Sequence, residues 1–438
     1  MIRKCTLTLV LLTIIFNSHA QLQQISLQDA IAFALKNNYD IRLTKNDSAS
    51  YALDNSFANA AFLPRLNATA SKQWNINAQK QELGNGTKKD TSGLKSNNLT
   101  AAMNLNWTLF DGLKMFATKE KLAEFVRLGA LGVKNQVVNS VANVITNYYN
   151  IVRQKQQLKA ILEQMSINEE RVKLADRKLS VGLGAKPELL QAKLDLNAQK
   201  AAVLQQNTLI DQLKEQLNQL TGINTTAYDV TDSIPENNEL NLEELRAAMV
   251  KENPSLLLAK KNIDIANLVL KENKASLFPT LSFNSAYTFS RATNKAVINS
   301  FTPLFNQNKG FNYGFGSSVP ILNGFNTQRL IRHSRLSIQY QQLLYDNQQS
   351  ILNVSLNNAF KDYGLQKKAL RLEEDNINLA KENITIALER YKQGVSTFLE
   401  LRTAQISLEE GYNRLIAARY NLKLAETELL RLKGDIVK

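Results

Sequence analysis

The sequence predicts a mixed fold in which each chain contributes four long β-strands and several very long antiparallel α-helices, arranged as two copies of one unit. An internal repeat is the first observation behind this, because Phe62–Leu66 is matched by Leu277–Leu281 at an offset of 215 residues. The second is strict alternation of apolar and polar residues in four segments. The third is helix length, since Val133–Ser180 contains no Gly or Pro.

The repeat sets the division of the chain. Three pairs of glycines recur at an offset of 212 residues: Gly112 and Gly324, Gly182 and Gly394, and Gly222 and Gly434. A loss of three residues between Pro279 and Gly324 relates this offset to the first one. We therefore expect a first structural repeat at 21–222, a linker at 223–240 and a second structural repeat at 241–438.

Residues 1–20 have the pattern of a secretory signal peptide. A basic start is followed by the apolar segment Leu7–Phe16 and by the small-x-small cleavage site Ser18–Ala20. The apolar segment is too short for a membrane anchor, and Cys5 precedes it, which excludes a lipoprotein signal. Because Cys5 is the only cysteine, we expect neither disulfides nor thiol chemistry in the mature chain.

Each copy opens with a helix that begins after a polar capping residue. Ser26 precedes a helical pattern expected over about 27–62, and Asn241 precedes one expected over about 242–276.

Four strands follow, two in each copy. They are expected at about 66–79, 98–110, 281–291 and 311–320. Their polar faces are almost entirely Asn, Thr, Ser and Gln, and Lys72 interrupts one apolar row. About ten residues or a little more is the length that a tilted membrane strand needs, whereas the alternative is a soluble sheet half covered by helices. The polar segments Lys80–Asn97 and Ala292–Gly310 are expected to be external loops.

The long helices complete each copy, at about 113–180, 187–221, 327–392 and 397–433. One apolar row recurs every seven residues in the third of them: Leu356, Tyr363, Leu370, Ile377, Ile384 and Tyr391. A second row follows the same period two residues further on: Leu365, Leu372, Leu379 and Ile386. Positions that differ by two residues lie about 200° apart around a helix, so the two rows are on nearly opposite sides. The pattern favours a helix with a neighbour on each side, as in a wall of helices, over an ordinary one-sided bundle.

Charge and hydropathy limit what the protein can bind and how it can contact a membrane. Without the signal the chain has 51 basic and 39 acidic residues. A basic balance can indicate nucleic-acid binding, but solvated helix faces explain it better in an exported protein. No later run approaches the ~20 apolar residues of a membrane helix. Integral contact with a bilayer would therefore require a closed β-barrel.

Four strands cannot close a barrel, so several chains must contribute. Two chains would supply eight strands, which enclose no channel. Three chains would supply twelve, an even number wide enough for a lumen. The geometry thus predicts a trimeric 12-stranded barrel accompanied by twelve long helices.

The chain resembles the TolC-type outer membrane efflux channels over nearly its whole mature length. The resemblance depends on the repeat and on equivalent boundary residues in the two copies. Pro64 and Pro279 precede the first strand of each pair, and Gly112 and Gly324 follow the second. Helical hairpin turns are expected around Gly182 and Gly394. It implies a homotrimer whose outer membrane barrel continues as a periplasmic helical tunnel, with Pro64, Gly112, Pro279 and Gly324 at the junction. It also implies two partners, a periplasmic adaptor (membrane fusion protein) and an inner membrane transporter.

The implied function is a passive exit duct of a tripartite efflux or type I secretion system, opened at its periplasmic tip. A non-channel coiled-coil scaffold is the main alternative, but it has no need of four Asn/Thr-faced strands. A diffusion porin is disfavoured by the long helices. No enzyme, cofactor or metal site is expected, since His333 is the only mature histidine and no nucleophile–base pair or phosphate loop is present.

The two helical turns are the candidate functional residues. Gly182 and Gly394 are expected to end a helix with positive φ. The resemblance places both turns at the periplasmic tip and implies that adaptors dock on Val181, Gly182 and Leu183, with Gly394 a weaker match.

An acid follows each turn glycine by six residues, Glu188 and Glu400. The resemblance implies that acids after the second turn ring the closed aperture, where three carboxylates would attract cations. Helix capping explains both acids as well, because Thr397 with Glu400 fits a capping box. Thr403 and Ser396 depart from the family pattern, in which an acid and a basic residue stand there. Tyr391 matches a gate-holding position, and we expect it to hydrogen-bond Glu188.

Overall fold

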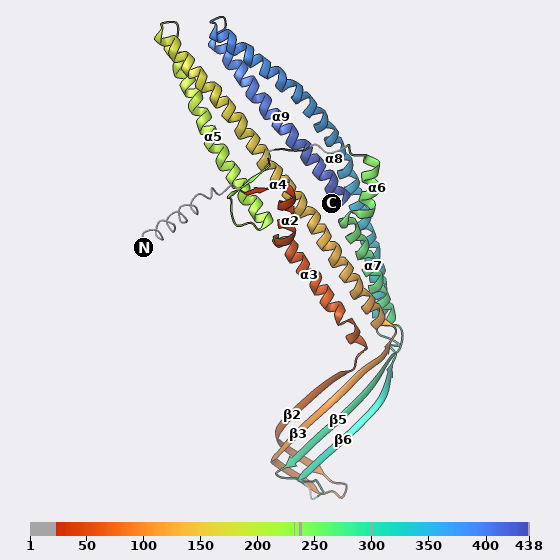
Figure 1. Ribbon diagram of the computed structural model, residues 1–438. Coiled ribbons are helices and arrows are strands. Elements are labelled where there is room, and N and C mark those ends of the chain that lie inside the picture. Colours follow the sequence, from red (N-terminus) through yellow and green to blue (C-terminus); the bar gives the residue numbers. More distant parts are fainter. Residues whose placement is uncertain (1–22, 232, 236–238, 299–300, 437–438) are drawn as a thin grey trace, which may run out of the picture. The chain divides into compact units, whose positions relative to one another are not determined.

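The computed structural model describes residues 23–231, 233–235, 239–298 and 301–436 (Figure 1). The expected signal peptide therefore lies outside the described residues. The chain divides into two compact units. The helical unit comprises the described residues of Met1–Ser48, Gly129–Leu258 and Asp346–Lys438, and the strand-bearing unit comprises Ala49–Leu128 and Ala259–Tyr345.

The elements repeat in the same order, and the long helices match in length. In chain order they are β1 (Gln23–Ile25), α2 (Leu27–Asn37), α3 (Tyr39–Ser56), the 3₁₀ helix η1 (Ala58–Phe62), β2 (Arg65–Glu82), β3 (Lys88–Asp111), α4 (Lys114–Ser180), α5 (Lys186–Thr221), β4 (Tyr228–Val230), α6 (Leu242–Glu252), α7 (Pro254–Ala275), β5 (Thr280–Asn294), β6 (Phe305–Ser318), α8 (Asn326–Lys392) and α9 (Phe398–Lys433). Helices α4 and α8 have 67 residues each, and α5 and α9 have 36 each. Four strands and long paired helices confirm the predicted mixed fold. Within the described part of the chain, no helix combines the length and apolarity needed to cross a membrane.

The strand-bearing unit contains a four-stranded antiparallel sheet with the order β2-β3-β5-β6 (Figure 1). The strands are longer than expected: the segment Lys80–Asn97, expected to be a loop, is largely strand, and strands β5 and β6 extend into both ends of Ala292–Gly310. The first hairpin extends to Glu82 and Lys88, which form an ion pair. Both faces are polar there, so the alternation that marks a half-buried strand is missing.

Each opening helix is broken in two, so the single helices expected at about 27–62 and 242–276 are wrong. The break falls at a buried asparagine, Asn38 in the first copy and Asn253 in the second. The Asn38 side chain accepts a hydrogen bond from the Ile41 amide at 3.1 Å and donates one to the Leu220 carbonyl at 2.9 Å. Asn253 makes the equivalent pair of bonds with Leu256 and Leu432. Each asparagine thus caps one helix start and ties it to the end of a long helix.

The helical unit holds a core that the expected linker helps to build. Strand β4, inside the region assigned to a linker at 223–240, pairs in parallel with β1. The buried Tyr148 of α4 fixes this pair, because its hydroxyl donates to the Ile25 carbonyl at 2.9 Å. The region is therefore partly structured, which its polar composition concealed.

Helix α8 shows the two opposite faces that its heptads predict. The row from Leu356 to Tyr391 is buried, with exposed fractions of 0–7 %. The second row, Leu365, Leu372, Leu379 and Ile386, has exposed fractions of 51–66 %. One chain therefore covers only one of the two apolar faces.

Candidate functional site

Both hairpin turns lie at the same end of the helical unit, where α4 meets α5 and α8 meets α9 (Figure 1). Gly182 has a φ of 75° and Gly394 a φ of 77°, so the predicted positive φ is confirmed. In each turn the residue after the glycine bonds back five residues: the Leu183 amide to the Lys178 carbonyl at 2.9 Å, and the Val395 amide to the Arg390 carbonyl at 3.0 Å. This is the Schellman closure of a helix end, and it is the same in both copies.

The first turn presents apolar side chains. Val181 is 62 % exposed and Leu183 is 82 % exposed, although both are aliphatic. Helix α5 then begins without a side-chain cap, since Ala185 occupies the N-cap position. Glu188 stands in its first turn, half-buried. The first turn therefore offers an uncovered apolar surface rather than a polar one.

The second turn presents a carboxylate. Thr397 caps α9, with its hydroxyl accepting from the Glu400 amide at 3.3 Å. Only this half of the predicted capping box forms, because the Glu400 carboxylate accepts instead from the Ser396 hydroxyl at 2.5 Å. Glu400 and Thr403 are exposed and line a groove of about 400 Å³ between α8 and α9. Thr403 bonds its own helix through the Leu399 carbonyl at 3.0 Å. The exposed Glu400 carboxylate, hydrogen-bonded by Ser396, therefore adds a negative charge to the groove.

Tyr391 has a different partner from the one expected. It is buried, and its hydroxyl makes no hydrogen bond with any described residue, so the expected bond to Glu188 is wrong. Lys178 of α4 contacts it instead, donating to the Tyr391 carbonyl at 3.0 Å with its ammonium 3.7 Å from the ring centre. Burial raises the pKa of Tyr391, and the nearby charge of Glu188 adds to this. Lys178 is thus a link between the two hairpins that the sequence did not reveal.

A buried polar cluster about two helical turns from Lys178 along α4 also joins the two hairpins. The Arg171 side chain of α4, which is 2 % exposed, contacts Asp195 of α5 and Gln405 of α9. Its guanidinium lies 4.8 Å from the centre of the Phe398 ring, and Arg402 lies 3.4 Å from the Asp195 carboxylate. Burial raises the pKa of Asp195, but hydrogen bonds from Gln191 and Arg171 and the two arginine charges outweigh this and leave it below its usual value.

A pattern in α4 could have revealed this cluster. Gln164, Asn168, Arg171 and Ala175 are all buried and follow helical spacing of three and four residues. Polar side chains in a row of that period indicate a polar contact inside a helix interface. The partners of Arg171 on α9 could not be identified in this way, because they lie 234 residues away in the chain.

The junction glycines differ between the copies, although both have positive φ, 72° at Gly112 and 63° at Gly324. A Cβ on Gly112 would lie 2.2 Å from the Ala275 carbonyl oxygen, whereas a Cβ on Gly324 would meet nothing within 4 Å. Each glycine is followed by a bulky residue that also has positive φ, Leu113 at 70° and Phe325 at 60°. Such residues rarely adopt this conformation, and no local sequence pattern predicts it here. Pro64 and Pro279 directly precede β2 and β5, as expected.

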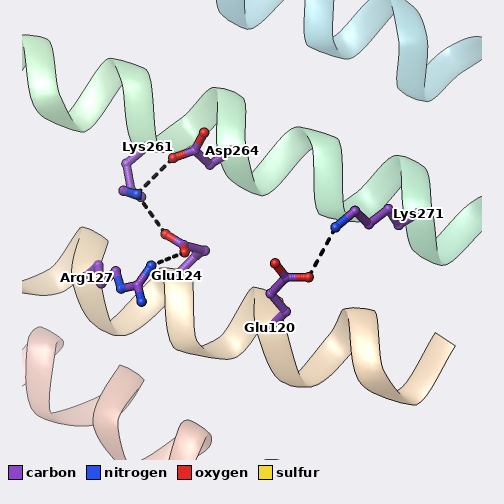
Figure 2. Close-up of polar contacts among 6 residues, drawn as sticks. All are labelled: Glu120, Glu124, Arg127, Lys261, Asp264 and Lys271. Carbon is purple, nitrogen blue, oxygen red and sulfur yellow. Dashed lines mark hydrogen bonds and ion pairs between the residues drawn. The ribbon is translucent and has the colours of Figure 1, made fainter. Parts of the chain in front are cut away.

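Ion pairs join α4 to α7 within the strand-bearing unit (Figure 2). Lys271 lies 3.2 Å from Glu120, and Lys261 lies 2.8 Å from Glu124. Lys261 also contacts Asp264 at 2.8 Å, and these contacts raise its pKa. Glu124 is buried, so this pair fixes the register of the two helices that lead to and from the sheet.

Comparison with known protein families identifies the family of this chain. The model of the family described as "Outer membrane efflux protein" matches residues 30–223 and 245–435, one match in each copy. This chain is an outer membrane efflux protein. Family members are transport channels rather than enzymes.

Relatives of this outer membrane efflux protein match it over nearly their whole length. The outer membrane efflux protein BepC of Brucella suis biovar 1 (strain 1330) is 22% identical over 416 residues, which are 93% of this chain and 85% of BepC. The alkaline protease secretion protein AprF of Pseudomonas aeruginosa is 20% identical, covering 92% of this chain and 84% of AprF. The CmeC outer membrane channel of Campylobacter jejuni superposes with a TM-score of 0.77 at 16% identity, covering 94% of this chain and 86% of CmeC.

The candidate site of this outer membrane efflux protein consists of the side chains that the two turns expose. Among the described residues, no group of three His, Cys, Asp or Glu side chains could hold a metal ion. Both turns expose aliphatic side chains, Val181 and Leu183 in the first and Val395 in the second, and the second adds the exposed acid Glu400. The aliphatic side chains can dock a partner, and the acid can attract a cation.

Proposed function

We propose that this protein is the outer membrane exit duct of a tripartite efflux or type I secretion system, a passive conduit with its helical tunnel in the periplasm. The observation that carries this is the open sheet. Its edge strands β2 and β6 have no further strand partner among the described residues, and they run in opposite directions. Open edges in lipid are prohibitively costly, so copies must pair edge to edge.

A homotrimer satisfies this requirement. Three copies contribute twelve strands, and because β6 of one copy is antiparallel to β2 of the next, the ring closes without a mismatch. The exposed row of α8, from Leu365 to Ile386, supports the same assembly. It gives each copy a second apolar helix face that a neighbouring copy covers.

The two turns form the periplasmic tip in this proposal, and they have different tasks. The apolar first turn, at Val181 and Leu183, docks the periplasmic adaptor. Gly394 and the second turn bring Glu400, with Thr403 one turn on, to the aperture, where threefold symmetry gathers three carboxylates. The contacts of Lys178 with Tyr391 and of Arg171 with Gln405 join the two hairpins of one chain. Opening therefore requires these contacts to separate, while Glu188 moves with the first hairpin.

The cargo follows from the transporter rather than from the duct. BepC is named for efflux and AprF for the secretion of an alkaline protease, yet both match this chain over most of their length. A shared duct thus serves different cargos, and the adaptor and inner membrane transporter that copurify with this protein would identify the class.

Channel recording tests the proposal. The purified protein in a planar lipid bilayer should form discrete channels of small conductance, because the tip contacts keep the duct narrow. The same preparation should run as a trimer in mild detergent. A preparation without conductance and without trimers would support the coiled-coil scaffold instead.

A further inference from the structure

Three cations of the four-stranded sheet, Lys72, Arg291 and Lys309, lie on its apolar face. Residues directly paired across strands share one face, so the register places Lys72, Leu99, Arg291 and Gln307 in one row. The neighbouring row toward the helices is Ala70, Ala101, Phe289 and Lys309. Three cations from three strands therefore lie within two adjacent rows. Their side chains are all exposed.

The opposite face is neutral over the same length. From the pair Asn67–Asn104 to the pair Asn75–Ser96, every residue on that face is Asn, Thr, Ser, Gln, Ala or Gly in all four strands. A channel lining would explain cations on the polar face. It does not explain cations on the face that also carries Leu66, Met103 and Tyr287.

The cations stand at one edge of an apolar band. An aromatic row, Trp107, Phe283 and Phe315, lies at the helix-proximal end of the sheet. Leu99, in the row of Lys72 and Arg291, is eight residues from Trp107 along β3, which is about 27 Å of strand. At the ~35–45° tilt of a barrel strand this is roughly 20 Å along the membrane normal, within the ~25 Å height of a lipid-facing band. Lys72 and Arg291 therefore lie near the far edge of the band and Lys309 one row deeper, and their long side chains reach the interface, where charge on the lipid face costs about 0–1 kcal/mol.

These three cations have no acidic partner within the described chain. Lys72 lies 5.0 Å from the ring centre of Trp74, and Arg291 lies 5.1 Å from that of Phe305. No described carboxylate forms an ion pair with Lys72, Arg291 or Lys309. By contrast, Lys80 and Lys88, further along the first hairpin, are paired with Asp90 and Glu82. The sheet thus holds a group of oriented cations on apolar and aromatic residues, without internal neutralisation.

We infer that Lys72, Arg291 and Lys309 form a binding surface for a phosphorylated lipid of the outer leaflet, with its acyl chains against the apolar band. The planar guanidinium of Arg291 binds a phosphate through two hydrogen bonds, and the lysines add point charges. Lys72 and Arg291 are two strands apart, about 10 Å, so they span a headgroup that carries two phosphates. The inference depends on the proposed function for its orientation, in which the apolar face meets lipid.

Lipid retention by the detergent-solubilised protein tests this inference. The probes are lipid A with two phosphates and its dephosphorylated form, with binding read by native mass spectrometry. We expect preferential retention of the phosphorylated form. The variant Lys72→Gln/Arg291→Gln/Lys309→Gln should bind it on the order of 100-fold more weakly, since each cation near an anionic surface contributes about fivefold.

Two control variants make the result specific. Lys72→Arg/Lys309→Arg keeps Arg291 and every charge and should retain the lipid. Lys80→Gln/Lys88→Gln removes paired lysines from the same hairpin and should also retain it. Equal retention of both lipid forms by the unchanged protein, or unchanged retention by the triple glutamine variant, would overturn the inference. Competition by millimolar inorganic phosphate would overturn it too, because it would identify a site for a free anion.

Channel recording separates this inference from the proposed function. The triple glutamine variant should conduct like the unchanged protein, because the cations face away from the polar side of the sheet. A protein that conducts but does not distinguish the two lipid forms contradicts the lipid surface alone. A protein that neither conducts nor forms trimers contradicts the duct.

Discussion

The two hairpin turns share a backbone and differ in what they present. Gly182 and Gly394 have φ angles within a few degrees of each other, and both turns close with the same pattern of hydrogen bonds. Yet the first exposes only aliphatic side chains, Val181 and Leu183, whereas the second exposes Val395 together with the acid Glu400 beside a groove. The repeat therefore preserves the geometry that reverses a long helix and leaves the side chains free to specialise. Duplication gives one chain two tip surfaces of different chemistry.

The largest difference between the copies should appear at the junction glycines. Gly112→Ala places a Cβ 2.2 Å from the Ala275 carbonyl oxygen and should cost about 4 kcal/mol of stability, from positive φ and overpacking together. Gly324→Ala meets open space and should cost about 1 kcal/mol for its φ alone. Yield of folded trimer and its thermal midpoint measure both. Equal losses would show that the copies are under the same constraint.

Removing the buried link between the hairpins should have the next largest effect. Arg171→Met leaves Asp195 without its main partner and should destabilise the tip by about 3 kcal/mol. Because Arg171 contacts both hairpins, the variant should open more often and conduct more. The matched control is Arg177→Met, an exposed position two turns along the same helix. Similar conductance in the two variants would remove Arg171 from the closure of the tip.

The apolar first turn should matter more for adaptor binding than the second. Leu183→Ser removes an 82 % exposed leucine whose burial on docking would contribute about 1.5–3 kcal/mol. The matched change in the second turn, Val395→Ser, also removes an exposed aliphatic side chain and should weaken binding far less. Affinity for the copurifying adaptor, measured by titration, checks both. A larger loss in Val395→Ser would reverse the assignment of tasks.

Low pH should weaken the contacts of Asp195 with Arg171 and Arg402, with a smaller effect than Arg171→Met. The folded-state pKa of Asp195 is lowered below its usual value of 3.8, so its stabilising contribution is complete above that value. The contribution is lost as pH falls through the lower folded-state pKa. Channel conductance should therefore rise below about pH 4. Asp195→Asn should show high conductance throughout, and a pH response that survives in this variant would have to come from another group.

The long helices could be predicted because the residues that end them act locally. Gly182, Gly222, Gly394 and Gly434 all have positive φ where the sequence expected helix ends. In α8 the buried and exposed heptad rows follow directly from the seven-residue period. Such features depend on neighbours a few residues away, so they are visible in the sequence.

Features that depend on distant partners were missed. Asn38 breaks its helix because its side chain reaches the Leu220 carbonyl, 182 residues away. Strand β4 forms only because β1 lies beside it. At the tip the same holds for Lys178, which bonds Tyr391 across 213 residues of sequence. The wrong expectation of a bond between Tyr391 and Glu188 has this origin, because the residue that contacts Tyr391 is Lys178 of the other hairpin.

Ion selectivity tests most directly whether Glu400 lines the aperture. Single channels should be recorded in a salt gradient for the unchanged protein, for Glu400→Ala and for Glu188→Ala, the matched acid after the first turn. We predict that the unchanged channel prefers cations, that Glu400→Ala loses much of this preference, and that Glu188→Ala keeps it. Identical reversal potentials for the unchanged protein and Glu400→Ala would show that Glu400 does not line the aperture.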